Sequence, residues 1–262
     1  MAYEFVLYER KGKIAYITLN RPQLLNAVND TMHQELVDAL NEFDTDKEAW
    51  IAILSGKGRC FSSGADVKQR QLRPREELER LGGPSGVKPA GGSIGLGQTV
   101  NWKPVIAAVH GYVLGISFAF MMGCDLVVAA EDTYLQIREV QRGLGGAGHW
   151  ASAWFWGGGK FANDIALTGR QFSAEEARAL GIVNRVVPAE QLMAEAESMA
   201  NEVLANPPLA VRGNVRVARL YMSKMTEDAS RYAGGSKLHL TEDFQESALA
   251  FMEKRPAIFK GK

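Results

Sequence analysis

Short apolar runs typical of β-strands alternate with amphipathic helical segments along the first 188 residues of the chain. The predicted strands cover residues 5–8, 14–19, 51–54, 105–109, 126–129, 134–137 and 182–187. Lys11-Gly12-Lys13, between the first two, has the composition of a hairpin turn. From Ala189 onward the pattern is helical. Strands with intervening helices, followed by a helical tail, predict an α/β core over residues 1–188 and a helical appendage over residues 189–262.

Capping residues mark the start of two predicted helices. One helix begins after Asn29 or Asp30 and shows a single apolar face. Another covers residues 174–180, because Ser173 and Glu176 have the spacing of a capping box and Gly181 is placed to end the helix.

The segment 69–98 differs from the rest of the core. It is rich in Arg and Glu as far as Arg80 and then in Gly and Pro. This composition predicts a short helix and a variable surface loop. We expect the loop to lie over the binding pocket.

Composition restricts the class of protein. The chain has 262 residues, 46% of them hydrophobic, and its 30 basic residues balance 30 acidic ones. No global charge therefore favours nucleic acid or an anionic membrane as a partner. Residues 105–124 are apolar enough for a membrane span, but interrupting glycines favour a buried strand, turn and helix. Two cysteines and no apolar leader in residues 1–12 predict a protein of the reducing cytoplasm.

Two segments share the order strand, glycine turn, helix. One ends in Ser62-Ser63-Gly64-Ala65-Asp66, and the other contains Gly111 through Gly115-Ile116-Ser117. A helix that begins after such a turn presents unpaired backbone N–H groups, which suit an oxyanion or a phosphate. The alternative is that the glycines serve only the turns. Neither segment has the phosphate-loop or dinucleotide fingerprint.

Several segments, in matching order and spacing, resemble the signature regions of the enoyl-CoA hydratase/isomerase (crotonase) family. They are Leu19-Asn20-Arg21-Pro22 with Asn26-Ala27, residues 61–68, residues 104–125, residues 167–188, and the ending Arg255-Pro256 with Phe259-Lys260-Gly261.

The resemblance implies a spiral of ββα units whose C-terminal helices form a homotrimer or a dimer of trimers. It also implies an acyl-CoA thioester as substrate, with no other cofactor and no metal. The thioester oxygen would be held by the backbone N–H groups of Ala65 and Ile116. The residues of the two turns, Ser63, Gly64, Asp66 and Gly115, would contact the substrate or its CoA. Ile116 departs from the family pattern, which usually has glycine there.

The acid/base residues also depart from the pattern. Family hydratases have two glutamates beside the substrate, and this chain has Ala119 at the first position and Glu139 at the second. Glu139 is therefore the candidate general acid/base. A single carboxylate suffices to move a proton between carbons or to start C–C cleavage. Without the resemblance, Glu139 would be interpreted as an exposed carboxylate.

Three further residues are weaker candidates. His149 lies in a glycine-rich segment and either supplies a second titrating group or has only a structural role. Lys68 and Lys260 are candidate contacts for the CoA phosphates, Lys260 from a neighbouring subunit. Two alternatives remain open: a hydrolase of C–C bonds in a cyclic or β-dicarbonyl compound, and a non-catalytic protein with this fold.

Overall fold

The computed structural model describes residues 3–84 and 102–262, with two β-sheets at its centre. Its strands are β1 (Val6–Lys11), β2 (Ile14–Leu19), β3 (Ile51–Gly56), β4 (Val105–Val109), β5 (Tyr112–Leu114), β6 (Leu126–Ala130), β7 (Tyr134–Gln136), β8 (Phe172–Ser173) and β9 (Arg185–Val187). The larger sheet has the order β1-β2-β3-β4-β6-β9, and the smaller one has the order β5-β7-β8. Among the strand pairs of the described residues, only β1–β2 and β7–β8 are antiparallel.

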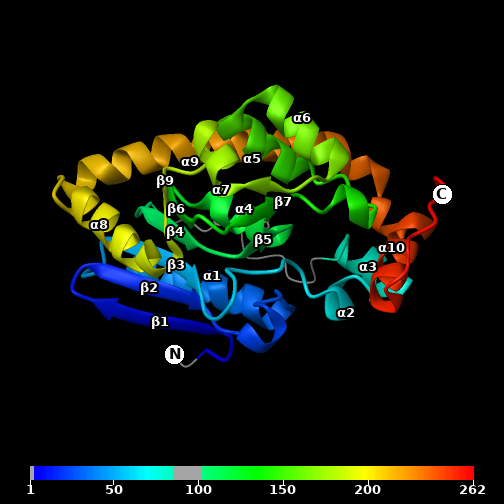
Figure 1. Ribbon diagram of the computed structural model, residues 1–262, viewed down its shortest axis with the longest axis horizontal. Helices are drawn as coiled ribbons and strands as arrows, with labels where there is room; N and C mark the ends of the chain where they lie inside the picture. Colours follow the sequence, from blue (N-terminus) through cyan, green and yellow to red (C-terminus); the bar gives the residue numbers. More distant parts are fainter. Residues whose placement is uncertain (1–2, 85–101) are drawn as a thin grey trace.

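Helices surround the two sheets. They are α1 (Asp30–Thr45), α2 (Val67–Arg70), α3 (Arg75–Leu81), α4 (Ile116–Gly123), α5 (Ala147–Gly157), α6 (Gly159–Thr168), α7 (Ala174–Ala179), α8 (Leu192–Leu204), α9 (Pro208–Ala233) and α10 (Glu242–Glu253). The 3₁₀ turns are η1 (Pro22–Leu24), η3 (Val140–Arg142), η4 (Ala189–Gln191), η5 (Gly234–Ser236) and η6 (Leu238–Leu240). Figure 1 shows the long α9 running across the upper part of the molecule, with α5 and α6 at the top and α2, α3 and α10 at the right.

Successive units of the chain place one strand in each sheet and then a helix. β4 joins the larger sheet, β5 joins the smaller one, and α4 follows; β6, β7 and α5 repeat this order. This arrangement confirms the predicted spiral of ββα units with a helical C-terminal region.

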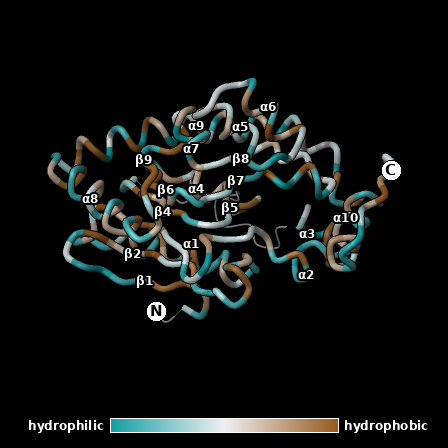
Figure 2. Tube along the Cα trace, in the orientation of Figure 1, coloured by the Kyte–Doolittle hydropathy of each residue, from teal (hydrophilic) through white to brown (hydrophobic). Residues whose placement is uncertain are grey.

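Both faces of the larger sheet are buried along its central strands β3, β4 and β6, as expected for parallel strands. Along β3, Ala52 and Leu54 belong to the core shared with α1, while Ile51 and Ile53 face the core formed with α8. Figure 2 shows apolar segments near β6 and β9 and polar ones at the tip of the β1–β2 hairpin. Because α8 packs on this sheet, it is part of the core of the subunit. The assignment of residues 189–262 to an oligomerisation region stays a prediction.

Local signals in the sequence predicted several elements correctly. The β1–β2 hairpin forms, and Asn29 and Ser173 cap α1 and α7 through their side chains. The strand expected over residues 182–187 is wrong in its first half. The N–H groups of Ile182 and Val183 both donate to Ala177 O, so they complete the end of α7.

Other elements differ from the prediction or were missed. β5, β8, α5 and α6 were not predicted. The segment 69–98 contains the end of α2 and all of α3, and its part from residue 85 onward lies outside the described residues. Residues 105–124 form β4, β5 and α4, and no helix in the described ranges is long and apolar enough to cross a membrane.

A buried ion pair ties α9 to the larger sheet. Arg219 is 4% exposed, and its Nε donates to Asp125 Oδ1 at 3.0 Å. Asp125 Oδ2 accepts from the Val105 N–H at 2.7 Å. Burial raises the pKa of Asp125 above its usual range, although Arg219 opposes the shift.

Arg219→Met is therefore expected to lower the free energy of unfolding by about 3–5 kcal/mol, because it leaves a buried carboxylate without its cation. Urea denaturation followed by circular dichroism measures the change. Asp125→Asn combined with Arg219→Met removes the unpaired carboxylate and should recover part of the lost free energy of unfolding. A single variant as stable as the parent protein would contradict this view of the pair.

Candidate active site

The two glycine turns singled out in the sequence lie side by side. The Ser62 N–H donates to Tyr112 O at 3.0 Å, and the Leu114 N–H donates to Ser62 O at 3.3 Å. Gly64 has a φ of +93° and is so close to the second turn that a Cβ there would lie 2.6 Å from Leu114 O. A side chain at position 64 would therefore force the turns apart.

The backbone N–H groups of Ala65 and Ile116 remain available at these turns. Ile116 is the first residue of α4, where a backbone N–H has no partner within the helix. In the described part of the chain, neither N–H donates to a protein acceptor. Gly115, with a φ of +55°, turns the chain into α4. Two free donors at adjacent turns can bind one anionic oxygen.

A cavity of about 1800 Å³ opens in front of both turns. Its wall contains the proposed turn and contact residues Ser63, Gly64, Ala65, Asp66, Lys68, Gly115 and Ile116, together with Ala119, Glu139 and His149. Lys260 is absent from this wall, and its Nζ lies 3.6 Å from Oε2 of Glu242 on α10.

Glu139 reaches the cavity from the turn after β7, just before η3. Its carboxylate lies beside the second glycine turn, since a Cβ on Gly115 would be 3.1 Å from Glu139 Oε1. Gly146 also lies against Glu139, because a Cβ at position 146 would be 2.9 Å from Glu139 Cβ. The side chain is 15% exposed, and its buried Oε2 has no hydrogen-bond partner among the described residues. One carboxylate oxygen is therefore left for substrate or water.

His149 lies next to this carboxylate, in the first turn of α5. Its Nε2 is 3.1 Å from Gly115 O and 3.3 Å from Glu139 Oε1. Both neighbours are acceptors, so Nε2 must carry the hydrogen and donate. His149 thereby links Glu139 to the turn that presents the Ile116 N–H. The sequence left its role open between a structural residue and a titrating one.

Ala119 occupies the position where family hydratases have their first glutamate, and it faces the cavity one helical turn after Gly115. Ala119 therefore contributes no titrating group to the cavity wall at this position. The Ile116 side chain is buried in the main core and also contributes to the cavity wall.

Asp66 has a structural role beside the first turn. Its side chain caps α2 by accepting from the Gln69 N–H and pairs with Arg21 at 2.7 Å. Arg21, from the segment before η1, also lies on the cavity wall.

The arginines on this wall include Arg70, Arg138 and Arg142, and sequence reasoning did not single out Arg70 or Arg142. Burial lowers the pKa of all three, to about 10 for Arg70 and Arg142. The residues around Arg70 and Arg142 have the composition of surface segments, so no periodic signal marked these two arginines. No group of three or more His, Cys, Asp or Glu residues in the described ranges is arranged to hold a metal ion.

Comparison with known proteins identifies the family of the chain. The sequence profile described as Enoyl-CoA hydratase/isomerase matches residues 9–262. A mevalonyl-coenzyme A hydratase of Aspergillus fumigatus is 36% identical, with 92% of this chain and 89% of that protein covered. A probable enoyl-CoA hydratase of Rhizobium meliloti is 34% identical, with 99% of each chain covered.

A solved structure extends the comparison to the fold. The crystal structure of a carnitinyl-CoA hydratase from Mycobacterium avium matches with a TM-score of 0.83 and 31% identity, and all of both chains is covered. The chain therefore belongs to the enoyl-CoA hydratase/isomerase family and is an acyl-CoA-processing enzyme of that type.

Proposed function

We propose that the enzyme binds an acyl-CoA with its thioester oxygen between the N–H groups of Ala65 and Ile116. Glu139 then moves the proton on the carbon next to the thioester. One observation carries the proposal: the Glu139 carboxylate lies beside the Gly115–Ile116 turn, in the cavity that Ala65 and Ile116 both line. Charge that develops on the thioester oxygen would meet preorganised donors, each worth about 3–4 kcal/mol.

A single carboxylate can complete the hydration of a 2-enoyl thioester. As the water oxygen bonds to C3, Glu139 accepts a water proton and the electron pair of the double bond moves onto the thioester oxygen. When the resulting enolate collapses, protonated Glu139 gives that proton to C2. One H and one OH have been added, and the carboxylate is regenerated. Isomerisation needs the same group, which takes a proton from C2 and returns it to C4.

The position of Ala119 supports this single-carboxylate chemistry, because a side chain without a titrating group faces the cavity there. His149 supports it as an orienting residue, since its Nε2–H lies between Gly115 O and the Glu139 carboxylate. The same contact favours a second candidate function: hydrolysis of a C–C bond in a carrier-free cyclic or β-dicarbonyl compound, with His149 assisting Glu139.

We also propose the oligomeric state implied by the family resemblance, a homotrimer or a pair of trimers in the cytoplasm. The support comes from α9, which exposes large apolar side chains. Leu209, Val217, Leu220, Tyr221 and Tyr232 are all more than half exposed in the single chain. In this assembly, Lys260 would contact the CoA phosphates bound by a neighbouring subunit.

Thermal unfolding in the presence of two ligands separates the two candidate functions. Acetoacetyl-CoA at ~100 times its dissociation constant is expected to stabilise the fold by about 2.7 kcal/mol and to raise the melting temperature. A carrier-free β-diketone at the same concentration should leave it unchanged. A shift with the diketone and none with the thioester would replace the first proposal by the second.

A further inference from the structure

Arg70 is a buried arginine on the cavity wall, and the proposed proton transfer does not use it. Arg70 ends α2, the short helix that follows the Ala65 turn, and its side chain is 1% exposed. It lines the same cavity as Ala65 and Glu139. Along an α-helix each residue advances about 1.5 Å, so Arg70 lies roughly 6 Å beyond Asp66 along the helix axis. A short acyl chain whose thioester lies at Ala65 can therefore extend as far as the Arg70 side chain.

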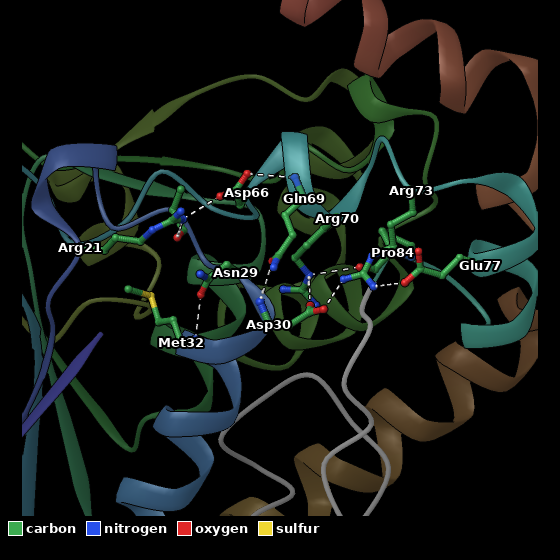
Figure 3. Close-up of polar contacts among 11 residues, drawn as sticks. Arg21, Asn29, Asp30, Met32, Asp66, Gln69, Arg70, Arg73, Glu77 and Pro84 are labelled. Atoms are coloured by element: carbon green, nitrogen blue, oxygen red, sulfur yellow. Dashed lines mark hydrogen bonds and ion pairs between the residues drawn. The ribbon is translucent and has the colours of Figure 1, made fainter. Parts of the chain in front are cut away.

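The terminal nitrogens of Arg70 lack partners. Its Nε donates to Pro84 O at 3.1 Å and lies 3.5 Å from Asp30 Oδ1, but Nη1 and Nη2 make no hydrogen bond to any described residue. Figure 3 shows these contacts, with the guanidinium of Arg70 beside Asp30 and Arg73. A buried guanidinium whose terminal N–H groups have no acceptor destabilises the fold, because those groups have lost their hydration without gaining hydrogen bonds.

The surrounding charges compensate Arg70 only in part. Asp30 is shared, since its Oδ2 accepts from Arg73. Arg73 in turn pairs with Glu77, which is 37% exposed. Burial lowers the pKa of His33 to about 4, so His33 is neutral at pH 7 and does not change the charge around Arg70. Asp30, whose side chain is 26% exposed, is therefore shared between the guanidinium groups of Arg70 and Arg73.

We propose that Arg70 binds a carboxylate at the far end of the acyl group, so that the enzyme's preferred substrates are CoA thioesters of dicarboxylic acids. This inference rests on the proposed function of the site. The planar fork of Nη1 and Nη2 matches a carboxylate and forms two charge-assisted hydrogen bonds with it. The acyl carboxylate fits better than a CoA phosphate, because Arg70 is almost fully buried whereas phosphates are strongly hydrated.

The test compares matched thioesters by isothermal titration calorimetry. The three pairs are succinyl- and butyryl-CoA, glutaryl- and pentanoyl-CoA, and adipyl- and hexanoyl-CoA. At the best-fitting length, the dicarboxylic member is expected to bind at least about tenfold more tightly, which corresponds to about 1.4 kcal/mol. Equal affinities within every pair would overturn the inference without any variant.

Variants then assign the preference to one residue. Arg70→Met is expected to abolish it while the monocarboxylic thioesters still bind, and Arg70→Lys should retain part of it. Arg73→Met is the matched control, because it removes the other guanidinium on Asp30 from a residue that does not line the cavity. That variant should keep the preference.

Other outcomes would refute the assignment. If the preference survives in Arg70→Met, or disappears in Arg138→Met instead, Arg70 is not the receptor. If Arg70→Met weakens both members of a pair and free CoA equally, the residue binds a CoA phosphate. If no thioester binds the unmodified enzyme, the proposed function itself fails. A cooperative thermal transition of each variant shows that its fold is retained.

Discussion

Glu139→Gln is expected to lower kcat for thioester turnover by about 10²–10⁴-fold and to leave thioester binding nearly unchanged. The amide has almost the shape of the carboxylate but cannot accept the proton that Glu139 takes up in the proposed reaction. Loss of the conjugated absorbance of crotonyl-CoA measures hydration, and calorimetry measures binding. An effect on kcat alone would show that the carboxylate acts in the transition state.

Glu227 supplies the matched control for this variant. It lies on the wall of the same cavity, but on α9 and exposed to solvent. Glu227→Gln should therefore turn over substrate like the unmodified enzyme. Full activity in Glu139→Gln would remove Glu139 from the mechanism, whatever the family of the chain.

Ile116→Pro is expected to lower kcat by about 10²–10³-fold, since it deletes one of the two N–H donors to the developing oxyanion. The position makes this substitution informative. Ile116 is the first residue of α4, where proline is well tolerated because no helical hydrogen bond is lost. Because the Ile116 side chain is buried, its removal lowers the melting temperature, and the fall in turnover is therefore measured against a variant that loses the same side chain.

Ile116→Gly distinguishes the effect of the lost N–H on kcat from the effect of the lost side chain. It removes the same β-branched side chain as the proline variant but keeps the donor, so the ratio of kcat between the two variants reports the N–H alone. Equal turnover in the two variants would mean that this N–H does not stabilise the transition state.

The sequence predicted the elements that carry their own signals. β4 is a continuous apolar run, and α1 begins at a capping residue with one apolar face. By contrast, α5 begins after Gly146 without a side-chain cap and consists largely of apolar and small residues. Its helical state depends on packing against α6 and α9. Two- and three-residue strands such as β8 and β5 are too short to show alternation.

The candidate site divides in the same way. Ala65, Ile116 and Glu139 were assigned through motifs in register, and their roles remain proposals, although the structure places all three on one cavity wall. The contact between His149 and Glu139 joins two different elements and follows from the folded path of the chain, not from their spacing. Arg70 was missed because its segment has the composition of a surface loop. Its burial depends on Asp30, which is forty positions earlier in the chain.

The most direct measurement is a crystal structure of the enzyme with acetoacetyl-CoA. We expect the thioester oxygen to lie about 2.7–3.1 Å from both the Ala65 and Ile116 nitrogens. The Glu139 carboxylate should face the carbon between the two carbonyl groups. A thioester oxygen bound by side chains or solvent, out of hydrogen-bonding range of these two amides, would contradict the account.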